Sequence, residues 1–178
     1  MNSKTLNNIA IGIILISLAT VTRIIPHLWN FTAVGAVFLF STFYFKNRNV
    51  RFLIPITIML FSDLCLNFLN GTPSAGAGIY LCLMLYIPVS TFFIKKLKVK
   101  NVFLAGLSGS TLFFITSNFL VWIQGGGYGL GLIQTYAVAV PFYLNSILGN
   151  LAWSTVLFGL YSLSKGTVKQ APSIYTKD

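Results

Sequence analysis

The basic residues of this sequence are gathered into short groups that alternate with long apolar runs, and this alternation constrains the fold more than any other feature. A membrane-spanning helix needs about 20 mostly apolar residues. Six runs are candidate spans, namely 6–25, 31–45, 52–69, 78–94, 102–123 and 139–163. The second of them is the shortest. The pattern predicts an all-α membrane protein with about six transmembrane helices. Residues 129–138 are a candidate interfacial helix before the last span.

The positions of the basic residues on this six-span map predict its orientation. Only Arg23 lies on one side, and the others lie on the opposite side: Lys4, Lys46, Arg48, Arg51, Lys95, Lys96, Lys98, Lys100, Lys165, Lys169 and Lys177. Cytoplasmic loops of membrane proteins carry an excess of Lys and Arg. We therefore expect both termini in the cytoplasm, an even number of spans, and a multi-pass protein of the cytoplasmic membrane.

The composition agrees with a membrane protein of one domain. Hydrophobic residues make up 56% of the chain and charged residues only 8%, whereas soluble domains carry about 25% charged residues. We expect residues 1–178 to form a single integral domain in the lipid bilayer, with a flexible cytoplasmic tail at 164–178. The net charge of +10 is explained by the basic groups between spans, so no nucleic-acid partner is expected.

Polar residues within the spans concentrate in the half of the bilayer opposite the basic groups. Asp63 is the clearest case, because a carboxylate in a transmembrane helix faces the bundle interior and needs a partner. Asn67 follows it on the same helical face, and the fifth span ends in Asn118 and Trp122. Their shared depth predicts an outward-facing pocket for a small solute. The expected substrate-binding residues are Arg23, His27, Trp29, Asn30, Asp63, Asn67, Asn118, Trp122, Tyr128 and Asn145.

The chemistry of these side chains assigns each an expected role. Aromatic rings would stack on a flat or apolar part of the solute, and those available are Trp29, Trp122 and Tyr128. Amides would pair with its donors and acceptors, and those available are Asn30, Asn67, Asn118 and Asn145. Arg23 either binds an anionic group of the solute or neutralises Asp63, and in the second case the solute is neutral. The Gly-rich loop 125–131 is a candidate lid.

Each of these residues also has a purely structural interpretation. Trp and Tyr form belts at membrane interfaces, Asn hydrogen-bonds helices together, and Arg23 can extend to the headgroups. Small residues raise a related question, because Ala105 with Gly109 and Gly106 with Ser110 are spaced four apart in the fifth span. Such faces pack helices inside the bundle, which we favour, or against a partner protein.

No enzyme motif accompanies the expected pocket. The sequence has no GxxxxGK[ST] phosphate loop, no HExxH and no GxSxG, the motifs of nucleotide hydrolysis, zinc proteolysis and serine hydrolysis. We therefore expect no catalytic activity, no cofactor and no metal site. The remaining enzyme hypothesis is a proton shuttle between Asp63 and His27.

Short motifs spread over most of the chain resemble those of a known family. They are Arg23-Ile24-Ile25-Pro26-His27 with Asn30-Phe31-Thr32, then Ser62-Asp63, then Ser117-Asn118-Phe119 with Trp122, and finally Pro141-Phe142 with Asn145 and Gly149-Asn150. As a set they resemble an uncharacterised family of small bacterial membrane proteins assigned to transport. Those proteins in turn look like S components, the substrate-binding subunits of energy-coupling-factor (ECF) importers for vitamins.

This resemblance implies a function and a set of partners. The chain would capture a small vitamin-like solute in its outward-facing pocket, in a bacterial cytoplasmic (inner) membrane, and reorient together with an ECF transmembrane component and ATPase subunits. The alternative hypothesis is a structural or assembly protein that binds other membrane proteins through its small-residue faces.

Overall fold

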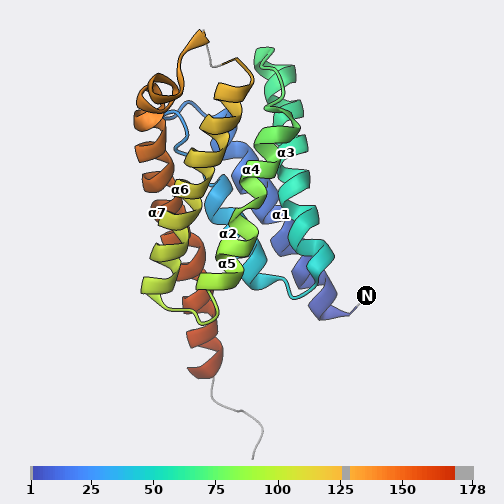
Figure 1. Cartoon of the computed structure of the whole chain (residues 1–178). Helices are drawn as coiled ribbons and strands as arrows, with labels where there is room; N and C mark the ends of the chain where they lie inside the picture. Colours follow the sequence, from blue (N-terminus) through green and yellow to red (C-terminus); the bar gives the residue numbers. More distant parts are fainter. Residues whose placement is uncertain (1, 126–128, 171–178) are drawn as a thin grey trace, which may run out of the picture.

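The computed structural model describes residues 2–125 and 129–170, and this part of the chain is helical without any strand. Its helices are α1 (Ser3–Ile24), α2 (Val34–Tyr44), α3 (Arg48–Asn70), α4 (Gly76–Met84), α5 (Tyr86–Phe93), α6 (Val99–Ile123) and α7 (Leu132–Gln170). They form one bundle (Figure 1). The all-α class expected from the sequence is confirmed.

Five helical segments of the described chain are long and apolar enough to cross a membrane. They are Thr5–Ile24, Arg48–Asn70, Gly76–Phe93, Val99–Ile123 and Leu132–Lys165. The second predicted span is wrong as a full span, because α2 has only 11 residues. At 1.5 Å per residue it covers about half of a hydrocarbon core of about 30 Å. The chain still returns across the bundle there, partly as non-helical backbone.

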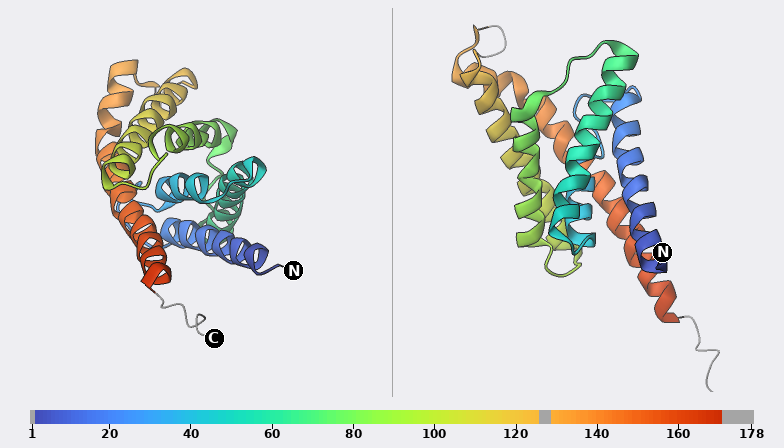
Figure 2. Two further views of the ribbon diagram at one scale, coloured as in Figure 1. Left: turned by 90° about the horizontal axis from the view of Figure 1, so that it is seen from below. Right: turned by 90° about the vertical axis from the view of Figure 1, so that its right-hand side faces the viewer.

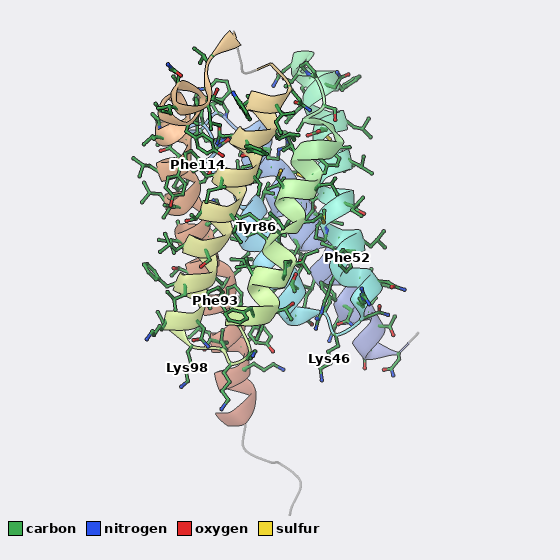
Figure 3. The ribbon with its side chains drawn as sticks, viewed as in Figure 1. Lys46, Phe52, Tyr86, Phe93, Lys98 and Phe114 are labelled. Atoms are coloured by element: carbon green, nitrogen blue, oxygen red, sulfur yellow. The ribbon has the colours of Figure 1, made fainter. Side chains whose placement is uncertain are left out.

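The predicted topology requires the basic groups to lie at one end of the bundle, and the structure agrees. The start of α1 and the end of α7 are at the same end of the bundle (Figure 1). Lys46 and Lys98 mark that end, whereas Phe114 lies toward the opposite end (Figure 3). The positive-inside rule predicts that this basic end faces the cytoplasm, and we call the half of the bundle away from it the outer half.

Prolines shape two of the spans. The fourth span breaks at Leu85 into α4 and α5, because Pro88 lacks the N–H that would bond to the carbonyl of Met84. Pro141 lies inside α7, and that helix is visibly bent (Figure 2). Such bends are the usual result of a proline within a helix.

The helix α7 differs from its sequence prediction at both ends. A separate interfacial helix over 129–138 is wrong, because α7 runs without interruption from Leu132 through the predicted last span. At its other end α7 continues to Gln170, so residues 164–170 of the expected tail are helical. Its 39 residues extend over about 58 Å, and its lower end projects beyond the other helices (Figure 1).

The short helix α2 forms the centre of the core. All residues from Val34 to Thr42 are buried, and α2 contacts α1, α3, α5, α6 and α7. Seen from below, it lies between α1 and the α4–α5 span (Figure 2). Its apolar character on every side is typical of a helix enclosed by others.

The small residues of α6 pack inside the bundle, as favoured from the sequence. A Cβ at Gly109 would overlap the ring of Tyr86 in α5, and one at Gly106 would lie 3.3 Å from Leu151 in α7. Ala105 and Ser110 are fully buried. This face of α6 is therefore occupied by the protein's own helices.

Candidate functional site

The segment between α1 and α2 brings non-helical backbone into the outer half of the bundle. Phe31 N–H donates to the Leu28 carbonyl at 2.8 Å, and Asn30 has φ 65°, a left-handed conformation that Asn adopts more readily than most residues. Ala33 N–H then donates to the Thr22 hydroxyl at 3.1 Å, which ties the start of α2 to the end of α1. Non-helical backbone at membrane depth is stable only within protein or beside a polar cavity.

A glycine on α7 lets this segment pack closely against the helix. A Cβ at Gly149 would lie 3.1 Å from both Phe31 Cα and Thr32 N, closer than side chains normally approach. The sequence motifs Asn30-Phe31-Thr32 and Gly149-Asn150 are therefore packed on each other, although more than 100 residues separate them in the chain.

A cavity of about 220 Å³ lies against this segment in the outer half of the bundle. Its wall is formed by residues from α1, the 25–33 segment, α2, α3, α4, α5, α6 and α7, together with Ala75: Arg23, Asn30, Thr32, Val34, Gly35, Met59, Ala75, Ile79, Leu83, Tyr86, Phe113, Ser146 and Asn150. Amide and hydroxyl residues thus line one space from the 25–33 segment, α5 and α7. We call it the main cavity because every helix of the described bundle contributes to its wall, although it is not the largest by volume.

Asn150 organises the polar side of the main cavity. Its Nδ2 donates to the Tyr86 hydroxyl and to the Ser110 Oγ, both at 2.6 Å. Asn150 is 3% exposed, and Gly35 of α2 leaves the space that its side chain fills. These contacts join α2, α5, α6 and α7 at mid-bundle depth, where Tyr86 lies (Figure 3).

A smaller cavity of about 150 Å³ adjoins the main cavity on the side of α6 and α7. The two share Asn30, Ile79, Phe113 and Ser146 as lining residues. The smaller cavity adds Asn118, whose Nδ2 donates to the Phe114 carbonyl at 2.7 Å. This bond does not use the Asn118 amide oxygen, which is an acceptor.

Arg23 and Asp63 form an ion pair beside the main cavity, with 2.7 Å between Nη2 and Oδ1. Arg23 also donates to the Ser62 hydroxyl. The second carboxylate oxygen of Asp63 accepts from Ser74 Oγ at 2.9 Å, Ala75 N–H at 2.8 Å and the Tyr80 hydroxyl at 2.7 Å.

This ion pair is satisfied by the protein itself. Asp63 is 6% exposed, and each of its oxygens has a partner. Acidic residues buried in a membrane require partners of this kind. The pair joins α1, α3, the α3–α4 loop and α4, and the charge that Arg23 brings to the cavity wall is neutralised by Asp63.

The structure brings only part of the sequence-predicted site to the cavities. Three of the ten residues line them, namely Arg23, Asn30 and Asn118. Asp63 lies behind Arg23. Five others do not line either cavity within the described chain: His27, Trp29, Asn67, Trp122 and Asn145. Tyr128 and the centre of the proposed lid 125–131 lie outside the described residues.

Several of the residues away from the cavities have structural contacts instead. Trp29 is 77% exposed and makes an edge-on ring contact with Phe142 at 6.4 Å between centroids. Trp122 lies against Phe119 at 5.6 Å. Asn67 Nδ2 donates to the Thr72 carbonyl at 3.2 Å. Exposed Trp at this end of the bundle is typical of an interfacial belt.

Sequence reasoning missed several lining residues, chiefly Thr32, Gly35, Tyr86, Ser146 and Asn150. Ser146 and Asn150 are four residues apart in α7 and so share a helical face, a signal that was present in the sequence. Tyr86 gave no such signal, because it stands alone in an apolar run and its partner Asn150 is on a distant helix.

His27 and Asp63 are not hydrogen-bonded to each other in the described chain. The His27 ring contacts the Ile25 carbonyl at 2.5 Å, whereas Asp63 is engaged by Arg23, Ser74, Ala75 and Tyr80. The described residues also contain no group of three or more His, Cys, Asp or Glu able to hold a metal ion.

The fold and its cavities define a multi-pass helical membrane protein with a polar-lined space in its outer half. The chain belongs to DUF6580, a family of unknown function, whose model matches residues 3–173. This agrees with the uncharacterised family expected from the sequence motifs. No curated protein and no solved structure is significantly similar to the chain.

Proposed function

We propose that this protein binds a small, uncharged polar solute in the main cavity and the smaller cavity beside it. The observation that carries the proposal is the convergence of amide and hydroxyl groups on adjoining spaces within the outer half of a membrane bundle. The groups are Asn30, Thr32, Tyr86, Asn118, Ser146 and Asn150. Small-molecule sites combine a mostly apolar wall with a few placed polar groups, and this lining has that character.

The charge of the solute follows from the ion pair. Arg23 is the charged residue that lines these cavities within the described chain, and Asp63 neutralises it at 2.7 Å. An anionic solute would have to compete with Asp63 for Arg23, and a cationic solute would find no free carboxylate at the wall. A solute without net charge can bind while Arg23 and Asp63 remain paired.

We propose further that the protein is an S-component-like subunit of an ECF-type importer in a bacterial cytoplasmic membrane. The sequence motifs resemble the uncharacterised family, and the step from that family to S components rests on the size of the chain, its about six predicted spans, their topology and the outward-facing polar cluster. The lack of a phosphate-loop motif in the sequence agrees with this step. Energy would then come from a partner complex of an ECF transmembrane component and ATPase subunits. Co-purification from native membranes, followed by mass spectrometry of bound proteins, tests this step.

The alternative of an assembly protein is weakened by the helix packing. Two small-residue faces could carry such a role: that of α6 is covered by Tyr86 and Leu151 of the same chain, and that of Ala33, Gly35 and Ala36 is buried. The assembly hypothesis predicts a stable protein partner other than ATPases and no bound solute.

Native mass spectrometry of gently purified protein tests the solute-binding proposal. We expect a small molecule bound to the wild type and lost, at least tenfold, in Asn30→Ala and Asn118→Ala together. Phe68→Ala is the control, because this residue of α3 is exposed and lines neither cavity. Retention of the solute in the double asparagine variant, or absence of any solute from the wild type and from protein incubated with membrane extracts, would overturn the proposal.

A further inference from the structure

A third cavity lies at the opposite, basic end of the bundle, between the start of α6 and the second half of α7. Its volume is about 350 Å³. The wall is mainly apolar and includes Val99, Val102, Phe103, Leu151, Phe158 and Gly159. Val99 is 89% exposed and Phe103 is 48% exposed, so this space borders the outside of the bundle. We call it the α6–α7 groove.

One buried polar group in the α6–α7 groove has no partner within the described chain. Ser154 is 1% exposed and lines the groove, yet its hydroxyl makes no hydrogen bond there. Other buried or half-buried serines bond to a carbonyl of the preceding turn, as Ser62 does to Ile58 and Ser117 does to Phe113, both at 2.6 Å. An unpaired buried hydroxyl costs about 1–3 kcal/mol, and an acceptor supplied by a ligand in the groove would remove this cost.

Positive charge is concentrated at the cytoplasmic end of the same groove. Lys95, Lys96, Lys98 and Lys100 surround the start of α6, and Leu97 and Val99 from this stretch line the groove itself. The first turn of α6 contains no acidic residue, and its N-cap Lys98 provides no side-chain cap. The N–H groups of a helix's first turn lack intrahelical partners and attract anions.

The groove therefore offers three kinds of contact in order of depth. A cationic rim at the start of α6 comes first, the buried Ser154 hydroxyl follows deeper along α7, and the apolar side chains of Val102, Phe103 and Leu151 line the same part of the groove. A phospholipid presents the matching chemistry in the same order, namely a phosphate, an ester carbonyl just below it, and an acyl chain.

We propose that the α6–α7 groove binds one anionic phospholipid of the cytoplasmic leaflet. The phosphate lies at Lys98, Lys100 and the start of α6, the glycerol backbone lies beside Gly159, an ester carbonyl accepts from Ser154, and an acyl chain continues past Leu151. Anionic lipids are a feature of cytoplasmic leaflets and are attracted by basic groups close to the membrane. The charge complementarity favours them over zwitterionic lipids. This inference is independent of the solute cavities.

Full-length protein in detergent, titrated with dioleoyl phosphatidylglycerol or dioleoyl phosphatidylcholine, tests the proposal. We expect native mass spectrometry to show one phosphatidylglycerol retained at least fivefold better than phosphatidylcholine. Phosphatidylglycerol should also raise the midpoint of thermal unfolding by several degrees. Gly159→Leu should abolish this retention, because a side chain there enters open space and fills the groove without a clash. Lys98→Gln with Lys100→Gln should remove the preference for the anionic lipid.

Two variants keep the test decisive even if one of these proteins fails to fold. Ser154→Ala removes a donor that no described residue uses, so it should fold normally and retain phosphatidylglycerol several-fold less. Ala152→Leu is the matched control, because Ala152 is exposed on α7 and does not line the groove. Equal retention of the two lipids by the wild type, or unchanged retention in Ser154→Ala and Gly159→Leu, would overturn the proposal.

Discussion

Gly35 of α2 and the side chain of Asn150 of α7 lie so close that no methyl group fits between them. A Cβ at position 35 would be 2.8 Å from the Cγ and the Nδ2 of Asn150. The same Asn150 amide donates to Tyr86 and Ser110, so it cannot move without breaking these bonds. The contact fixes the distance between α2 and α7 at the wall of the main cavity.

The substitution Gly35→Ala should therefore destabilise the protein. Overpacking of a tight core costs about 1–3 kcal/mol, and here it also displaces Asn150. Thermal unfolding in detergent, followed by intrinsic fluorescence, measures the effect. Gly12→Ala is the control, since its Cβ would meet only Ile54 at 3.8 Å, and this variant should be as stable as the wild type or slightly more stable. Equal stability of Gly35→Ala and Gly12→Ala would contradict the packing described.

The hydrogen bonds of Asn150 should behave as one network. Asn150→Ala leaves the buried Tyr86 and Ser110 hydroxyls without their donor, which should cost about 1–3 kcal/mol. Tyr86→Phe removes one of those hydroxyls and should cost less. In the double variant the two losses should not add, because they concern the same contact. Additive shifts in the free energy of unfolding would mean that Asn150 and Tyr86 act independently.

The ion pair should contribute to stability and not to solute binding. Arg23→Gln leaves the buried Asp63 charge without its partner, and such losses reach about 3–5 kcal/mol; Asp63→Asn should cost less, because Arg23 is only part-buried. The double variant Arg23→Gln with Asp63→Asn should be more stable than the two single losses together predict. Chemical unfolding in mixed micelles gives these values. A variant Arg23→Gln that keeps wild-type stability but loses the bound solute would instead show that Arg23 holds the solute.

The orientation of the bundle can be tested by labelling single cysteines in intact cells. In a background with Cys65→Ala and Cys82→Ala, a cysteine introduced by Lys98→Cys should react with a membrane-impermeant maleimide only after the cells are opened. A cysteine introduced by His27→Cys, at the opposite end, should react in intact cells. The reverse pattern would invert the topology and place the main cavity in the cytoplasmic half.

Most of the fold could be predicted from the sequence because membrane spans are local features. Length, apolarity and basic boundaries identified α1, α3 and α6 closely, as well as the combined α4–α5 span. The errors arose where tertiary contacts override local pattern. The outer part of the second span is non-helical because it packs against Gly149 and Thr22, and neither neighbour is visible from residues 25–33 alone.

The candidate site was less predictable, because depth in the membrane does not determine direction around a helix axis. Asn30, Asn118, Asn145 and Trp122 all lie at the outer end, but only the first two line the cavities. The pairing of Arg23 with Asp63 was left open by the sequence and is observed in the structure. Tyr86 was hidden because its role depends on Asn150, a contact between residues 64 positions apart.

The interrupted second span has a consequence for how binding preference can change within this architecture. Where a continuous helix would have filled the outer half, the chain instead places Asn30 and Thr32 on a loop at the wall of the main cavity. Replacing these two side chains alters the lining without changing any transmembrane helix or its partners. On the proposed function, substitutions at a few loop positions would adapt the same scaffold to a different solute, with little effect on membrane insertion.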